Sequence, residues 1–253
     1  MAVSAVGYLR IASTDVDAWM DFGTNVLGLM DAAREDAAGA RFLRMDDHPF
    51  RFMIEPGDAD KLLATGLEFP TEAAWQATLD ALAAGGHEVS EGSAEDAKRR
   101  CVTGLASVSD PAGNLLELYW GRELDYVTLV SPTGVPGFVT TYQQTGDMGF
   151  GHLVLPTPDI ETATAFYTDL IGTGVTDVLY PPGMDGVKIN FMHANNPRQH
   201  SVALFNGPHP LGVVHIMVEV ENMDEVGRGM DRAKAAGSHF LATLGRHVND
   251  NMC

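Results

Sequence analysis

The chain has 253 residues, a formal net charge of −18, 45% hydrophobic residues and 20% charged residues. This length is typical of one large or two ordinary globular domains, and the composition argues against intrinsic disorder. The excess of carboxylates excludes most nucleic-acid-binding roles, because phosphate recognition needs Lys and Arg, and it disfavours an anionic membrane surface as a partner.

Cysteine content and hydropathy indicate the compartment. Only Cys101 and Cys253 occur, too few for a disulfide framework, so a reducing, cytoplasmic location is expected. The first residues lack the cationic and apolar stretches of a secretory signal. No run approaches the ~20 apolar residues that a membrane helix needs.

An internal repeat organises the chain. Residues 6–11 (VGYLRI) match residues 150–155 (FGHLVL) at an offset of 144. Each copy predicts a strand, a turn and an amphipathic helix, with an acidic cap at the helix start and a left-handed glycine at its end. These capping residues are Asp15 and Asp159, followed by Gly28 and Gly172.

A second match lies further along, between residues 83–87 (AAGGH) and 235–239 (AAGSH), at an offset of 152. Each follows a predicted helix, and apolar alternation predicts strands around both. The helices are expected over Glu72–Ala84 and Asp224–Ala236, and the strands over Lys61–Glu68, Val102–Ser109, Leu115–Trp120 and Val213–Val220. A Pro-Gly turn at 110–114 joins two of these strands.

The repeat predicts an α+β fold of two tandem domains, each with a strand–helix–strands pattern that occurs twice. The first domain is expected over residues 1–131 and the second over 146–253, with a linker over 132–145 in a region rich in Gly, Pro, Ser, Thr and Gln. The last unit of the second domain is incomplete.

Histidines distinguish the two halves, since seven of the nine follow residue 150. His152 replaces Tyr8 of the first copy, and His215 lies in an apolar strand whose counterpart region, 58–86, contains no histidine. Each alone is more often a core or surface residue. Together, on equivalent first strands, they favour a metal-binding pair.

A third ligand is not evident in the second half. Glu219 shares a strand face with His215 but lies four residues, or about 13 Å, along the strand, which is too far for one mononuclear site. Glu117 of the first half follows Gly85 by 32 residues, and the same spacing after Gly237 (237 + 32 = 269) passes Cys253. The matching carboxylate is therefore expected beyond this chain.

Further histidines are candidates for acid–base chemistry. His200, at the entry of a strand, and His247 each suit proton transfer near neutral pH. His193 and His209 are interpreted as loop or pocket residues. His239 matches His87 at a helix exit and is interpreted as structural.

These features resemble the vicinal oxygen chelate superfamily and, more narrowly, the type I extradiol catechol dioxygenases, such as 2,3-dihydroxybiphenyl 1,2-dioxygenases and steroid-catechol ring-cleaving enzymes. The segments that carry the resemblance are GYLRI (7–11), LRMDD (43–47), DPAGN (110–114), GFGH (149–152), PRQHS (197–201), VHIMVEV (214–220) and LGRHVND (244–250). The resemblance implies that each domain consists of two βαβββ units forming a partly closed mixed sheet around a funnel.

The resemblance also implies a site. His152 and His215 fall on the iron ligands, with a Glu ligand and a proton-donating Tyr expected beyond Cys253. His200 falls on the active-site base, and His247 falls on a catalytic histidine that hydrogen-bonds the substrate. Asp250 falls on a residue of the substrate site that supports it. Fe(II) is the implied cofactor, and Mn(II) accepts similar ligands.

The implied reaction is extradiol cleavage of an aromatic catechol with insertion of both atoms of O2, in a homo-oligomer such as a dimer or octamer. Alternation around the candidate histidines predicts an apolar pocket that suits a multi-ring catechol, lined by Val154, Phe191, Met192, Ala203 and Phe205. Two alternatives stay open: another metal-dependent lyase, isomerase or resistance transferase, and a non-catalytic binding protein. The pair His200 and His247 favours the dioxygenase, whereas the missing carboxylate favours the binding protein.

Overall fold

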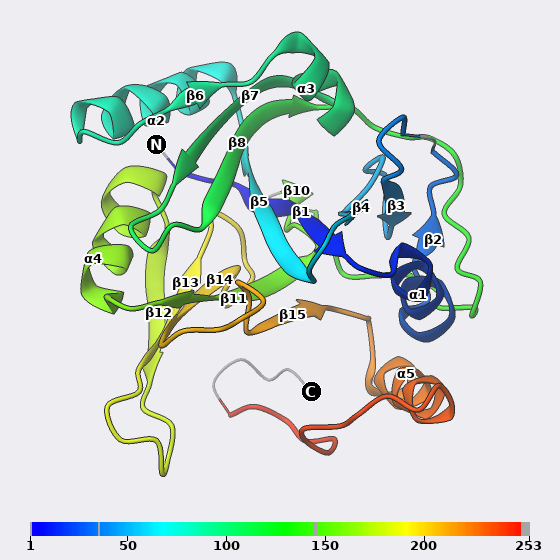
Figure 1. Cartoon of the computed structure of the whole chain (residues 1–253). Coiled ribbons are helices and arrows are strands. Elements are labelled where there is room, and N and C mark those ends of the chain that lie inside the picture. Colours follow the sequence, from blue (N-terminus) through cyan, green and yellow to red (C-terminus); the bar gives the residue numbers. More distant parts are fainter. Residues whose placement is uncertain (1, 35, 144–145, 249–253) are drawn as a thin grey trace.

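Two mixed β-sheets, one in each half of the chain, form the frame of the molecule (Figure 1). The computed structural model describes residues 2–34, 36–143 and 146–248. The first sheet has eight strands in the order β2-β3-β4-β1-β5-β8-β7-β6. Their bounds are β1 Ala5–Ser13, β2 Met30–Asp31, β3 Arg41–Arg44, β4 Phe52–Pro56, β5 Lys61–Phe69, β6 Ser90–Glu91, β7 Val102–Ser109 and β8 Leu115–Arg122.

The second sheet has five strands in the order β12-β13-β14-β11-β15. A short hairpin of β9 and β10 precedes it in the chain. The bounds are β9 Thr141–Tyr142, β10 Gly146–Asp147, β11 Gly151–Thr157, β12 Gly174–Leu179, β13 Ile189–His193, β14 Val202–Asn206 and β15 His215–Val218.

The helical segments lie outside the sheets (Figure 1). They are α1 Val16–Asp21, η1 Phe22–Leu27, α2 Glu72–Ala84, α3 Ala94–Arg100, α4 Ile160–Ala165, η2 Phe166–Ile171 and α5 Met223–Ala235. The predicted acidic caps are present, since the side chains of Asp15 and Asp159 accept bonds from the backbone N–H groups of Ala18 and Thr162. The helices end, as predicted, at glycines in the left-handed conformation. One feature was not predicted: η1 and η2 are π-helical.

The internal repeat is visible in the strand pairing. In each half the first strand pairs in parallel with one neighbour and antiparallel with the other, as β1 does with β4 and β5, and β11 with β14 and β15. The helices α2 and α5 are related by an offset of 151 (223 − 72). This corrects the offset of 152 that the short AAGGH match suggests.

The structure confirms the α+β class, and both sheets are open. One apolar core runs through both halves, and the rings of Phe52 and Phe150 meet across the junction with centroids 5.3 Å apart. The division at residues 131 and 146 stays a prediction. Cys101 is a buried free thiol. Among the described residues no helix is both long and apolar enough to cross a membrane.

The halves differ at one sheet edge. In the first sheet β5 lies between β1 and β8, and Glu117 of β8 pairs with Gly66 of β5. In the second sheet β15 is the edge strand of the described part of the chain, and only an isolated bridge between Phe138 and Val220 extends it. A strand equivalent to β8 is therefore not part of the second sheet as described.

Candidate active site

The two histidines predicted as a metal pair meet on one face of the second sheet. His152 lies on β11 and His215 on β15, and these strands are antiparallel with Val154 opposite His215. Side chains alternate along a strand, so His152 and Val154 share the face of His215. The Nε2 atoms of the two imidazoles lie 3.1 Å apart.

This geometry fits one divalent ion. Two nitrogen ligands at ~2.1 Å and at neighbouring positions of a six-coordinate ion lie roughly 3 Å from each other. Burial lowers the pKa of His152 to about 2, with further lowering by His200, His215, Arg198 and His247. Burial also lowers the pKa of His215, with His247 as the second cause. Both imidazoles are therefore neutral at neutral pH, as ligation requires.

His200 stands beside this pair. Its ring centroid lies 4.1 Å from that of His152 and 4.8 Å from that of Phe191. The side-chain oxygen of Gln199 contacts its Nδ1. A carbonyl oxygen only accepts, so this contact places the proton of a neutral His200 on Nδ1 and makes Nε2 the unprotonated nitrogen of the ring.

These side chains line a cavity of about 550 Å³. Most of its wall is apolar, with the histidines at one side and the carboxylate of Asp177 on β12. The lining residues are His152, Val154, Asp177, Leu179, Ile189, Phe191, His200, Phe205, Val214, His215, His247 and Val248. A second cavity, of about 300 Å³, reaches His152 and His200 beside Arg198, Met217 and Glu219.

Strand register explains why distant residues share the cavity. One row crosses the sheet through Asp177, Phe191, Ala203, Val154 and His215, each opposite the next. Asp177 was missed in the sequence because its place depends on this register. Asp177 and Leu179 lie two residues apart on β12 and so share a strand face, and this spacing was the signal that the sequence offered.

The remaining predicted residues lie in the strand row, in the hydrophobic core, at the cavity wall or in an ion pair. Ala203 is fully buried within the row. Met192 belongs to the hydrophobic core, on the strand face opposite Phe191, so the sequence alternation should have excluded it from the pocket. His247 is exposed and lines the cavity. Glu219 forms an ion pair with Arg198. Asp250 lies outside the described residues.

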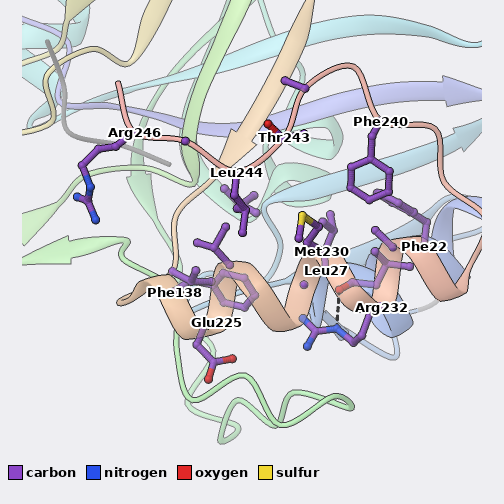
Figure 2. Close-up of a pocket in the computed structure, with 18 of the residues that line it drawn as sticks. Phe22, Leu27, Phe138, Glu225, Met230, Arg232, Phe240, Thr243, Leu244 and Arg246 are labelled. Carbon is purple, nitrogen blue, oxygen red and sulfur yellow. Dashed lines mark hydrogen bonds between the residues drawn. The ribbon is translucent and has the colours of Figure 1, made fainter. Parts of the chain in front are cut away.

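A larger cavity lies between the two halves. It has a volume of about 700 Å³ and lies between α5, η1 and the stretch 240–247 (Figure 2). Its wall carries Phe22, Phe138, Met230 and Leu244, and Arg232 closes one side by donating to the Val26 carbonyl at 2.9 Å. Of the four candidate histidines it includes His247 alone.

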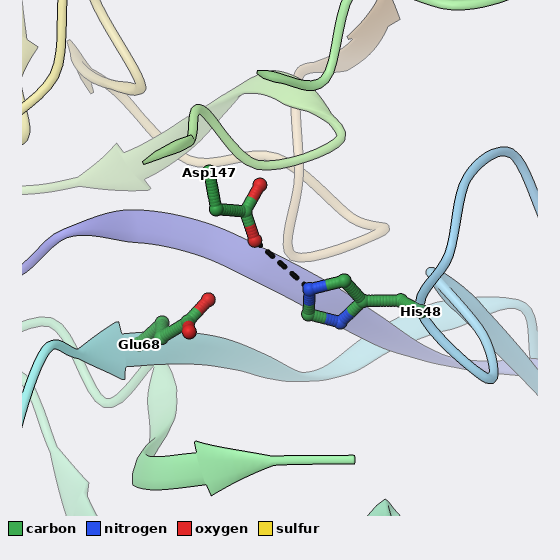
Figure 3. A group of neighbouring side chains, drawn as sticks. All are labelled: His48, Glu68 and Asp147. Atoms are coloured by element: carbon green, nitrogen blue, oxygen red, sulfur yellow. Dashed lines mark hydrogen bonds and ion pairs between the residues drawn. The ribbon is translucent and has the colours of Figure 1, made fainter. Parts of the chain in front are cut away.

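A third feature is a buried group of His48, Glu68 and Asp147, whose ligand atoms lie within 4.8 Å of one another (Figure 3). These residue types are metal ligands, but a cation is already present. The Nη1 atom of Arg122 contacts Asp147 and lies 2.7 Å from His48 Nε2 and 3.3 Å from a Glu68 oxygen. The guanidinium therefore supplies the positive charge that a metal ion would bring.

Comparisons with known families agree with this geometry. A model of the first domain of dihydroxybiphenyl dioxygenase BphC matches residues 6–57. A model of the glyoxalase/bleomycin resistance protein/dioxygenase superfamily matches residues 149–253. The fold and these matches define a protein of this superfamily, whose architecture is called vicinal oxygen chelate.

Individual relatives narrow the assignment. An iron-dependent extradiol dioxygenase of Rhodococcus jostii (strain RHA1) is 41% identical, over 100% of this chain and 84% of the relative. A biphenyl-2,3-diol 1,2-dioxygenase of Paraburkholderia xenovorans (strain LB400) is 38% identical, over 100% and 83%. The crystal structure of BphC, a halotolerant catechol dioxygenase, superposes with a TM-score of 0.89 at 30% identity, over 99% and 81%. The chain belongs to the extradiol catechol dioxygenases, a metal-dependent family of enzymes.

Proposed function

We propose that this chain binds Fe(II) through His152 and His215 and cleaves an aryl or polycyclic catechol beside its diol, with both atoms of O2 entering the product. The observation that carries the proposal is the 3.1 Å approach of the two buried Nε2 atoms at the wall of a largely apolar cavity. Relatives named for biphenyl-2,3-diol and 1,2-dihydroxynaphthalene support this substrate class.

Each residue has a distinct part in the proposal. Fe(II) held there would pass electron density between a catechol and O2, chemistry that no side chain provides. His200, with its Nδ1 proton directed to Gln199, offers Nε2 to a catechol proton. Such proton transfer contributes typically ~10²–10⁴-fold to a rate. His247, at the cavity wall, would hydrogen-bond the substrate.

The apolar wall would select and orient the substrate. Val154, Phe191 and Phe205 line the cavity beside the histidines. Burial of an aromatic ring against such side chains contributes roughly 25 cal/mol per Å² of apolar surface removed from water. The same wall excludes water from the reacting atoms and so strengthens the electrostatic interactions inside.

The third ligand, the identity of the metal and the assembly belong to the same proposal. A carboxylate would complete a site of two histidines and one carboxylate, which suits Fe(II) and is open to Mn(II). We also infer a cytoplasmic, homo-oligomeric enzyme. Size-exclusion chromatography with light scattering tests the assembly.

Oxygen consumption tests the proposal. The protein is loaded with Fe(II) without air and then mixed with 2,3-dihydroxybiphenyl and air, beside a longer chain that includes the expected Glu. A yellow ring-fission product with one O2 consumed per catechol is expected, and His152→Ala serves as the control. Absence of oxygen uptake by both chains, with this catechol and with 3-methylcatechol, would falsify the dioxygenase proposal.

A further inference from the structure

The backbone that leads into β11 passes through a tight space between the two sheets. Phe150 donates its N–H to the carbonyl of Val6 in β1 at 3.2 Å. A Cβ atom on Gly149 would lie 2.2 Å from that carbonyl oxygen, and one on Gly151 would lie 1.9 Å from the Met217 carbonyl oxygen. Both glycines have positive φ, 76° and 153°. The first sheet therefore contacts the strand of His152 directly.

Asp147, on β10, connects this entry to the first half of the molecule. Its carboxylate accepts from Arg51 Nη2 at 2.9 and 3.1 Å, from His48 Nε2 at 2.9 Å and from Arg122. The same carboxylate accepts the backbone N–H of Gly149 at 2.7 Å. Asp147 and His48 are buried, and Arg51 is fully buried. One carboxylate thus joins three side chains of the first half to the backbone three residues before His152.

Met148, the residue after Asp147, connects the same stretch to the segment of His200 through Arg198. Arg198 donates from Nε to the carbonyl of Met148 at 3.3 Å and from Nη2 to the carbonyl of Val139 at 2.7 Å. The Arg198 side chain also forms an ion pair with Glu219. Arg198 precedes His200 by two residues. The stretch 147–149 therefore lies against both segments that present site histidines.

We propose that Asp147 is a positioning residue: its contacts with Arg51, Arg122 and His48 fix the entry of β11 and thereby the His152 imidazole relative to His215. The proposal rests on the metal site proposed at these two histidines. Ligands have to be held within ~0.5 Å of the productive geometry by the residues around them. Loss of such support typically lowers metal affinity ~10–100-fold.

Asp46 provides a matched control. Its carboxylate also accepts from Arg51, at 2.5 Å to Nη2 and 3.0 Å to Nε, and from the backbone N–H of His48 at 3.1 Å, but it accepts no hydrogen bond from the stretch 147–149. Asp147→Asn and Asp46→Asn therefore each remove one negatively charged partner of the buried Arg51 guanidinium. Only Asp147→Asn also disturbs the start of β11.

The test uses Co(II), followed by its visible absorption, and hydrogen exchange of the metal-free protein. We expect Asp147→Asn to weaken Co(II) binding ~10–100-fold and to speed exchange at the amides of Gly149 and Phe150. Asp46→Asn should keep the wild-type Co(II) affinity and exchange, although both variants lower the unfolding midpoint. Unchanged affinity in Asp147→Asn, or an equal loss in both variants, overturns the proposal.

Two further measurements keep the outcome decisive. If Asp147→Asn does not fold, Arg122→Met is the variant to use, because it removes one donor to Asp147 and leaves the Arg51 contact. We then expect smaller changes of the same kind, in Co(II) affinity and in exchange at Gly149 and Phe150. If His152→Ala binds Co(II) as tightly as the wild type, the metal site itself is wrong. Exchange at Gly149 and Phe150 then decides whether Asp147 anchors β11.

Discussion

The two sheets place different chemistry at equivalent positions. In the first sheet Tyr8 occupies the place of His152, Ala64 that of His215 and Phe50 that of His200, by offsets of 144, 151 and 150. The first sheet also contains Glu117, whose oxygens accept from Tyr8 at 2.6 Å, Arg10 at 2.7 Å and Arg100 at 2.8 Å. There is a carboxylate in this half, but its counter-ions are arginines.

The comparison teaches how one frame can hold either a buried, charge-paired carboxylate or an open site of neutral imidazoles. Burial alone would raise the pKa of Glu117, yet the hydrogen bonds and charges of Arg100 and Arg10 hold it below its ordinary value. A buried carboxylate needs a cation, and a guanidinium or a metal ion meets the need. In the first sheet the guanidinium groups of Arg10 and Arg100 pair with Glu117 and occupy the position where a metal ion and substrate would bind. The second sheet keeps neutral imidazoles and a cavity.

The largest expected effect tests whether metal binding belongs to the second sheet alone. His152→Ala or His215→Ala should weaken Fe(II) or Co(II) binding at least ~100-fold, because each removes one of two neutral nitrogen ligands. Tyr8→Phe, at the position equivalent to His152, should leave the affinity unchanged. Anaerobic titration with metal analysis measures both. Equal affinity in His152→Ala and the wild type would contradict the assignment.

A second comparison concerns His200 and its equivalent, Phe50. His200→Ala should keep the metal and lose ~10²–10⁴-fold in turnover, because the base is removed and the ligands stay. Phe50→Leu should leave turnover intact and lower the stability of the first half. Oxygen uptake and metal content, measured on the same sample, distinguish the two effects. Loss of metal from His200→Ala would mean that His200 is a ligand.

The carboxylate of the first sheet gives a third test. Glu117→Ala should destabilise the protein by ~3–5 kcal/mol, because it leaves the buried Arg100 without its carboxylate partner and Arg10 with Glu55 alone. Urea unfolding measures the change, and Glu95→Ala on the exposed side of α3 serves as the control, with an effect within ~0.5 kcal/mol. A cost for Glu117→Ala no larger than that of the control would show that the arginines find other partners.

The smallest effect is a change of pH dependence at the junction. Burial, and next the charge of Asp147, raise the pKa of Glu68 to about 8, with Arg122, Arg51 and Tyr119 also facing it. The folded state then holds a proton that the unfolded chain releases, so Glu68 lowers stability as pH rises from about 4.5 to about 8. Glu68→Gln should remove this contribution and gain stability at pH 8 relative to pH 5. Thermal unfolding at both values measures it, and a parallel shift at both would contradict the prediction.

Local signals in the sequence were sufficient for most elements. The helix over Glu72–Ala84 and the strand over Val102–Ser109 have the predicted bounds, because caps, turn residues and apolar alternation act over a few residues. The repeat also placed His152 and His215 on equivalent strands. Their 3.1 Å separation needed the register between β11 and β15, which no local pattern contains.

Errors and omissions arose where the answer depends on residues far apart. An offset of 152 would match His215 with Leu63, whereas the structural offset of 151 matches it with Ala64, and one residue of slip changes the face of a strand. Asp177 entered the cavity through four strand pairings. The contact between Arg51 and Asp147 spans 96 residues and involves charged side chains that composition alone would place on the surface.

The π-helical turns carry information about ancestry. Segments η1 and η2 occupy Phe22–Leu27 and Phe166–Ile171, related by the same offset of 144 that relates the flanking strands. A π turn holds one residue more than an α-helical turn, so it records an insertion. Two independent insertions at the same position are a less economical history than one inherited insertion. One π turn inherited by both copies, present before the duplication, is therefore the simpler account of its place in each half.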